Sequence, residues 1–179
     1  MTPAELRQLR QLEKLKKRGQ SDLIEVRDSV IHGTGVYAAC DIGAEEHVVE
    51  YVGNLIDKET SEKRAWEQYD VATETGGAAV YIFNLTEKWD LDGNVEWNPA
   101  RLINHSCAPN CEAVQDGKRI FIQTLGEPVK KGEELTFDYG FEAESYADHP
   151  CRCGAESCIG YIVGKDYYDE FKKLLAAET

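Results

Sequence analysis

Eleven residues near the middle of the chain carry more polar chemistry than a strand-to-loop transition needs. The segment runs from Arg101 to Cys111 and reads Arg-Leu-Ile-Asn-His-Ser-Cys-Ala-Pro-Asn-Cys. Leu102-Ile103 is expected to fix it to a core. Ala108-Pro109-Asn110 then turns the chain, because proline fixes φ and asparagine tolerates turn conformations. Asn104 and His105 are therefore predicted to lie on a rigid corner, as a candidate site.

Cysteines follow this stretch and return near the C-terminus. Cys107 comes just after the Asn-His pair, and a CxCx4C cluster comprises Cys151, Cys153 and Cys158. Three closely spaced thiols need a fourth ligand to complete a tetrahedral zinc site. From the residues alone, that ligand is Cys107, Cys111 or His149.

A glycine loop earlier in the chain is a second candidate binding element. In Ser29-Val-Ile-His-Gly-Thr-Gly-Val-Tyr37, two glycines lie between strand-like runs and let the backbone approach a ligand closely. The full dinucleotide-binding fingerprint is absent, because no third glycine opens a helix. A plain glycine turn explains the pattern about as well.

Short strands separated by turns are expected to position these groups. Strands are predicted at 23–27, 47–52, 80–83, 111–115, 118–125 and 134–140. Asp116-Gly117 predicts a hairpin turn. A charged helix is predicted over 57–69, a loop over 73–79 and a closing helix over 166–177. The fold class is therefore mostly β with short helices, and Cys40 is expected to be a small core residue.

The N-terminus predicts a helix with defined ends. Thr2 is the expected N-cap, Glu5 closes a capping box, and Gly19 ends the helix. An apolar stripe is formed by Leu6, Leu9, Leu12 and Leu15. The stripe is expected to pack on the domain or to pair with another chain, which gives a possible route to self-association. A partner-binding tail is the alternative.

Composition limits the function classes. The 179 residues suffice for one domain with terminal additions, and the formal net charge is −13. Residues 1–20 hold six Lys or Arg against two Glu, so the rest of the chain is strongly acidic. An acidic body argues against direct nucleic-acid binding and favours a basic partner, although simple solubility explains the charge too.

Cysteine spacing and hydropathy predict a compartment. The sequence has neither a signal peptide nor an apolar run of transmembrane length, so no membrane partner is expected. The cysteines cluster with metal-like spacing, which predicts a reducing, intracellular compartment.

Four motifs occur in one order: Ile31–Tyr37, Arg101–Cys107, Glu134–Gly140 and the CxCx4C cluster. Together they closely resemble the SET-domain protein lysine methyltransferases that carry a post-SET zinc motif. The resemblance covers roughly Leu23 to Tyr161. It implies a β-clip type fold of small sheets with a knot-like C-terminal crossing.

The predicted elements and the family resemblance together give the expected domain organisation. It comprises an N-terminal helix (1–20), a SET domain (21–145) with a variable helical insert (57–79), a post-SET zinc-binding segment (146–164) and a C-terminal helix (165–179).

The resemblance also implies an activity and its residues. The activity is methyl transfer from S-adenosylmethionine to lysine in a basic protein, most of all a histone or histone-like tail. The implied cofactor contacts are His32, Gly33, Thr34, Gly35, Tyr81, Asn104 and His105. Tyr139 falls on the family's active-site tyrosine, and Tyr81 falls near the methyl-transfer channel. Cys107 becomes the fourth ligand of a structural Zn²⁺, beside Cys151, Cys153 and Cys158.

Phe137 bears on the number of methyl groups transferred. It lies two residues before Tyr139, hence on the same face of a strand. In the family, a tyrosine at this position can hold a water in the space that further methyl groups need. Phenylalanine there predicts di- or trimethylation.

The competing functions come from other classes. One is a non-catalytic, zinc-stabilised SET-like binding module that kept the fold and lost the chemistry. Redox or metal catalysis by the cysteines is weaker, because the cluster looks saturated. The protein is expected in the nucleus if eukaryotic, and in the cytoplasm or as a secreted effector if bacterial.

Overall fold

The structure is a computed structural model of the chain and describes residues 1–75, 81–144 and 146–177. The chain divides into two compact units. The first unit is Met1–Ile24, His47–Arg101 and Ala113–Gln123, and the second unit is Glu25–Glu46, Leu102–Glu112 and Thr124–Thr179. Ten strands and three α-helices lie in the described residues, which confirms the mostly β class. Among those helices, none combines the length and apolar character needed to cross a bilayer.

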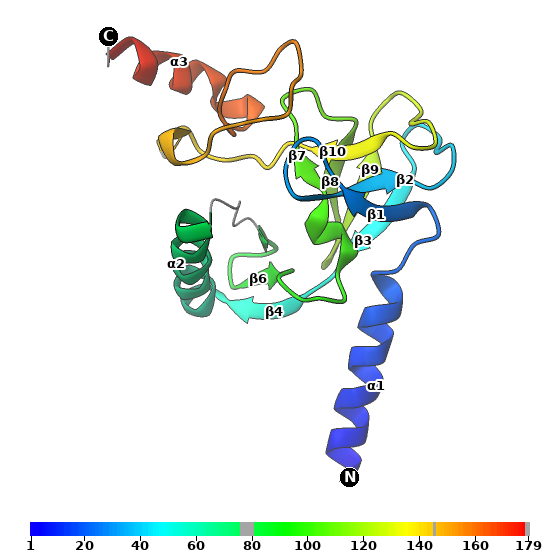
Figure 1. Cartoon of the computed structure of the whole chain (residues 1–179). Helices are drawn as coiled ribbons and strands as arrows, with labels where there is room; N and C mark the ends of the chain where they lie inside the picture. The colour runs from blue at the N-terminus through cyan, green and yellow to red at the C-terminus, as the bar shows by residue number, and fades with distance from the viewer. Residues whose placement is uncertain (76–80, 145, 178–179) are drawn as a thin grey trace. The chain divides into compact units, whose positions relative to one another are not determined.

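The second unit carries the strands around the candidate site (Figure 1). One sheet contains, in order, β1 (Ile24–Asp28), β2 (Thr34–Ala38) and β10 (Glu134–Phe137). The short strand β7 (Asn104–His105) runs parallel to β10. Their register places Thr136 opposite Asn104 and Phe137 opposite His105. The polar corner predicted from the sequence is therefore fixed against the strand that leads to Tyr139.

Two groups of paired strands organise the first unit. β3 (His47–Tyr51) pairs antiparallel with β9 (Arg119–Thr124), which follows β8 (Cys111–Asp116) after the turn predicted at Asp116-Gly117. Gly117 has a φ of 60°, a left-handed conformation that favours glycine. The second sheet has the order β4 (Asn54–Asp57), β6 (Trp89–Asp92), β5 (Ile82–Asn84).

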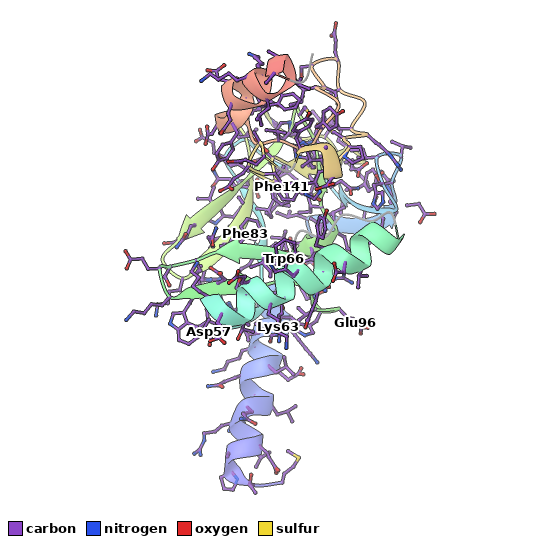
Figure 2. The ribbon with its side chains drawn as sticks, turned by 90° about the vertical axis from the view of Figure 1, so that its left-hand side faces the viewer. Asp57, Lys63, Trp66, Phe83, Glu96 and Phe141 are labelled. Atoms are coloured by element: carbon purple, nitrogen blue, oxygen red, sulfur yellow. The ribbon has the colours of Figure 1, made fainter. Side chains whose placement is uncertain are left out.

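Ion pairs hold the insert helix α2 (Lys58–Thr75) on this second sheet. Lys58 pairs with Asp90 and Arg64 pairs with Asp92, and both carboxylates are buried in β6. Figure 2 shows Asp57 at the start of α2 and Trp66 along it. The Trp66 side chain is 63% exposed.

The boundaries of the insert differ from the prediction at two points. α2 continues to Thr75, so the loop expected from residue 73 is wrong for 73–75. No glycine or proline interrupts the helix before Gly76-Gly77, which lie outside the described residues with the remainder of the expected loop. Val80 also lies outside them, and the strand predicted at 80–83 is observed as β5 from Ile82.

α1 (Pro3–Arg18) forms as predicted, with Thr2 and Glu5 in a capping box and Gly19 at its C-terminal end. A side chain at Gly19 would lie 2.4 Å from the Val52 side chain, so only glycine permits this approach. The apolar stripe is only partly buried: Leu6 and Leu9 are 40% and 48% exposed, whereas Leu12 and Leu15 are half-buried. Packing on the domain is therefore wrong for Leu6 and Leu9, and pairing with another chain stays a prediction.

The C-terminal segment of the second unit has its own apolar cluster. A short 3₁₀ helix (Lys165–Tyr167) leads into α3 (Tyr168–Ala177). The closing helix predicted over 166–177 is therefore observed as α3, two residues later at its start. The buried members of the cluster are Ala143, Tyr146, Val163 and Phe171. Cys40 was expected in the core and is exposed instead, because it follows the end of β2.

Candidate functional site

Asn104 is the point at which the glycine loop meets β7. Its side chain is nearly buried, and its amide nitrogen donates to the carbonyl oxygens of His32 and Thr34, each at 3.3 Å. The same nitrogen lies 3.1 Å from Ser29 Oγ and 2.8 Å from Glu134 Oε1. Two segments some 70 residues apart in sequence are thereby locked together.

Glu134 is a site residue that the sequence reasoning did not select. Ser29 Oγ donates to Glu134 Oε1 at 2.7 Å, and Tyr37 Oη donates to Oε2 at 3.0 Å. A side chain on Gly35 would lie 2.4 Å from Glu134 Oε1, so glycine is required for this approach. Burial, with the adjacent carboxylate of Glu134, raises the pKa of Tyr37. A signal was present, because Glu134 opens one of the four motifs.

The described residues of the glycine loop have distinct roles. Gly33 has a φ of 47° and turns the chain, whereas Gly35 makes room for the carboxylate. His32 and Thr34 contribute their carbonyl oxygens to Asn104. The structure therefore brings these predicted cofactor residues together with Asn104.

His105 joins the polar corner to the cysteines. Its imidazole is buried, which lowers its pKa although the nearby Asp138 carboxylate opposes the shift. The backbone N–H of Tyr139 donates to His105 Nδ1 at 3.3 Å. The proton of the neutral ring therefore lies on Nε2, which is 3.7 Å from Cys107 Sγ.

Tyr139 lies just beyond the end of β10. Because the strand ends at Phe137, the expected strand periodicity does not apply to this pair. The two rings nevertheless lie close, with centroids 4.9 Å apart, and the His105 ring is 5.4 Å from that of Tyr139. The Tyr139 hydroxyl donates to the Ile103 carbonyl oxygen at 2.9 Å. The motifs Arg101–Cys107 and Glu134–Gly140 therefore meet at Tyr139.

Four cysteine sulfurs gather in the second unit. They belong to Cys107, Cys151, Cys153 and Cys158, and they all lie within 4.8 Å of one another. Cys107 Sγ is 3.8 Å from the sulfur of Cys151 and 3.9 Å from that of Cys158. A tetrahedral site with zinc–sulfur bonds of about 2.3 Å separates its sulfurs by about 3.8 Å. The donor set and its spacing therefore fit a zinc ion.

The pKa values of three of these thiols are shifted, and not all in the same direction. Burial raises the pKa of Cys107 and of Cys151. At Cys153, burial is outweighed by backbone N–H groups of Cys107 and Ala155, and the pKa is lowered to about 6. A metal cation would supply the positive charge that turns all four thiols into thiolates.

The other two candidates for the fourth ligand lie apart from the four sulfurs. Among the described residues, the metal-like group does not include Cys111 or His149. Cys111 is buried where β8 meets Phe137 of β10, and burial raises its pKa to about 12. His149 packs against Phe141, with ring centroids 4.7 Å apart.

Tyr81 belongs to the first unit, whereas the other predicted site residues belong to the second. Its carbonyl oxygen accepts hydrogen bonds from Tyr51 Oη at 3.1 Å and from the backbone N–H of Gly93 at 2.7 Å. The Arg101 guanidinium lies 5.8 Å from its ring centroid. Its expected place beside the methyl-transfer channel stays a prediction.

The fold and the joined motifs define a SET domain. A family model described as SET domain matches residues 33–140, more than half of the chain. The chain therefore belongs to the SET domain family, which confirms the SET-domain part of the resemblance read from the sequence.

Relatives of this chain are named as histone-lysine N-methyltransferases. An Emericella nidulans protein named as specific for H3 lysine-4 is 37% identical over 154 residues, covering 83% of this chain and 12% of the relative. A Saccharomyces cerevisiae protein of the same name is 37% identical over 167 residues, covering 90% and 14%. The trithorax protein of Drosophila virilis is 39% identical over 150 residues, covering 82% and 4%. This chain thus spans at most about a seventh of the length of these three relatives.

Proposed function

We propose that this chain transfers methyl groups from S-adenosylmethionine to the side-chain amine of lysine in a basic protein. The observation that carries the proposal is the meeting of Asn104, His105 and Tyr139 where β7 runs beside β10. The membership in the SET family and the names of the relatives support it. A histone tail is the leading substrate, and the acidic chain suits such a basic partner.

The cofactor site is assigned to the glycine loop and the corner it contacts. It comprises His32, Gly33, Thr34, Gly35, Asn104 and His105. The hydrogen bonds of Asn104 to the loop pre-organise the backbone that would touch the ligand. S-adenosylmethionine supplies an electrophilic methyl group on a sulfonium sulfur.

The protein's part in the reaction is mainly positioning. A lysine amine has an ordinary pKa of about 10.4, so roughly one in a few thousand is neutral at pH 7. Burial beside a sulfonium lowers that pKa, because both desolvation and a like charge disfavour the ammonium form. No strong base is then required in the channel. Tyr139 orients the amine and the transferring carbon, since its hydroxyl hydrogen bond to Ile103 fixes the oxygen.

Phe137 sets the room available to the product. Its ring contacts that of Tyr139 and brings no hydroxyl to hold a water there. We therefore assign di- or trimethylation capacity to this chain.

The cysteines are assigned a structural Zn²⁺. The four ligands are Cys107, Cys151, Cys153 and Cys158, and four thiolates leave no open position for water. Because Cys107 is two residues from His105, the metal would hold the C-terminal loop beside the cofactor corner. The compartment we propose is the nucleus if the source is eukaryotic, and the cytoplasm or a secreted effector if it is bacterial.

The test is radiolabelled methyl transfer to a panel of basic proteins. Histone H3 leads the panel, because two of the relatives are named for its lysine 4. Label is expected in at least one substrate and is expected to fall at least a hundredfold with Tyr139→Phe, the loss typical of a positioned transition-state group. The matched control is Tyr167→Phe, which removes a hydroxyl from a half-buried tyrosine in the same unit. Equal incorporation by Tyr139→Phe and the parent would contradict the assigned role.

A further inference from the structure

The C-terminal helix and the cysteine loop share one aromatic cluster. The rings of Tyr146, Tyr161 and Phe171 meet edge to face, with centroids 4.9, 5.0 and 5.7 Å apart. Phe171 comes from α3 and is only 4% exposed, and Tyr161 lies at the end of the cysteine loop. In Figure 1 the orange loop leads into α3.

The base of the cysteine loop is closed by backbone contacts. Pro150 forms a bridge with Tyr161, and the N–H of Cys151 donates to the Gly160 carbonyl oxygen at 2.9 Å. The Tyr161 carbonyl oxygen lies 3.9 Å from Cys107 Sγ. Tyr161 therefore contacts the cysteine site through its backbone and the helix through its ring.

The first residue of α3 makes a second connection. Tyr168 packs against the apolar cluster, together with Tyr167 and Leu174 of the same C-terminal segment. Both the start of α3 and Tyr161 of the cysteine loop therefore contact this cluster.

The loop has little means of ordering itself. Between Cys151 and Gly160 it contains neither strand nor helix, and its three cysteines are only partly buried. Ordering such a segment costs backbone entropy, which apolar burial or metal binding must offset. Phe171 of α3 and Tyr146 are the two large buried side chains of the cluster next to the base of the loop.

We propose that α3 is a clasp on the cysteine loop, so that zinc binding and helix docking stabilise each other through the packing of Phe171 against Tyr161. The inference rests on the zinc site proposed above. Both events require the same arrangement of Tyr161, and each therefore favours the other by linkage.

The clasp also reaches the segment that carries Tyr139. The backbone N–H of Lys165 donates to Asp138 Oδ2 at 2.9 Å, and that of Gly164 donates to the Phe141 carbonyl oxygen at 2.9 Å. A side chain at Gly164 would lie 2.8 Å from Gly140 Cα, so the two backbones are in contact. Release of α3 would loosen both sides of Tyr139.

The first test measures amide hydrogen exchange of the full chain, loaded with zinc or stripped by a chelator. Exchange over residues 168–177 is expected to become at least tenfold faster without metal, as docking is lost. Exchange in α1, which belongs to the first unit, is the internal control and is expected to stay unchanged. Equal protection of α3 in the two states would overturn the proposal.

The second test measures zinc release to a chromogenic chelator. Phe171→Ala is expected to release zinc at least tenfold faster than the parent, because α3 loses its ring contact with Tyr161 and no longer helps to offset the ordering cost of the loop. Leu175→Ala removes a 38% exposed apolar side chain from the same helix and is expected to match the parent. Unchanged release by a folded Phe171→Ala would refute the clasp, and the exchange experiment on the parent decides the question if this variant does not fold.

The outcomes separate this inference from the proposed function. A parent that binds no zinc overturns the clasp and the metal assignment together, whereas methyl transfer by that parent would leave the enzymatic proposal standing. A zinc-loaded parent that fails to methylate any substrate would leave the clasp intact.

Discussion

Glu134 offers the sharpest test of how the glycine loop is held. The change is Glu134→Gln, which keeps the shape of the side chain and removes its charge. The carboxylate accepts from Ser29 at 2.7 Å, from Asn104 at 2.8 Å and from Tyr37 at 3.0 Å. An amide retains the two contacts at one oxygen, loses the charge assistance, and presents N–H groups to the Tyr37 hydroxyl.

The magnitude follows from these three contacts. A hydrogen bond to a charged group contributes about 1.5–3 kcal/mol, and a neutral one about half of that. Glu134 is half-buried, so solvent screens part of the difference, and a loss of about 1–2 kcal/mol of loop order is expected. If that order is needed for cofactor binding, affinity for S-adenosylhomocysteine falls roughly five- to thirtyfold.

Titration calorimetry with zinc-loaded protein measures this affinity. Glu133→Gln is the matched control, because it removes the same charge from the exposed neighbouring residue. A control that binds like the parent, with Glu134→Gln weakened, supports the reasoning. Two variants with the same dissociation constant as the parent would refute it.

Three further perturbations have defined outcomes. Phe137→Tyr is expected to stop at one methyl group where the parent adds two or three; mass spectrometry that finds one methyl for both contradicts the prediction. Cys107→Ser is expected to lose zinc in native mass spectra while Cys111→Ser keeps it, and the reverse would overturn the ligand assignment. Glu50→Gln is expected to cost about 1–3 kcal/mol in denaturant unfolding, because Arg18 loses a buried partner. Although burial opposes it, hydrogen bonds from the arginines lower the Glu50 pKa in the folded state. The parent should therefore lose stability as pH falls below about 4.5, and the variant less so; equal slopes would exclude Glu50 as the source.

The sequence alone predicted those features of the fold that depend only on neighbouring residues. The capping box at Thr2 and Glu5 and the left-handed turn at Gly117 depend on a few neighbouring residues, and both are observed. The four cysteines could be grouped only with help from the family resemblance, because Cys107 is 44 residues from Cys151, the nearest of the other three. Residue types and spacing alone left Cys111 and His149 open.

Contacts between distant segments account for what the sequence reasoning missed. Glu134 is 105 residues from Ser29 and 97 from Tyr37. The residues next to Glu134 in the sequence do not indicate that it contacts these two side chains. The strand around it was predicted to reach Gly140, yet it ends at Phe137. The ladder stops there because β7 offers only two residues, and the next backbone N–H groups turn to other acceptors: that of Tyr139 donates to His105 Nδ1.

Because β10 ends at Phe137, the backbone N–H of Tyr139 is available to His105 rather than to a neighbouring strand. With the Tyr139 N–H bound to Nδ1, the imidazole must place its proton on Nε2, toward the Cys107 sulfur. One ring thus connects the backbone of the proposed catalytic tyrosine with a proposed zinc ligand. A metal bound at the cysteines would help to fix the position of Tyr139 through two hydrogen bonds of the His105 ring. One joins Nε2 to the Cys107 sulfur, and the other joins Nδ1 to the Tyr139 N–H. The metal itself would not contact the substrate. Loss of zinc should therefore reduce turnover even while cofactor is still bound.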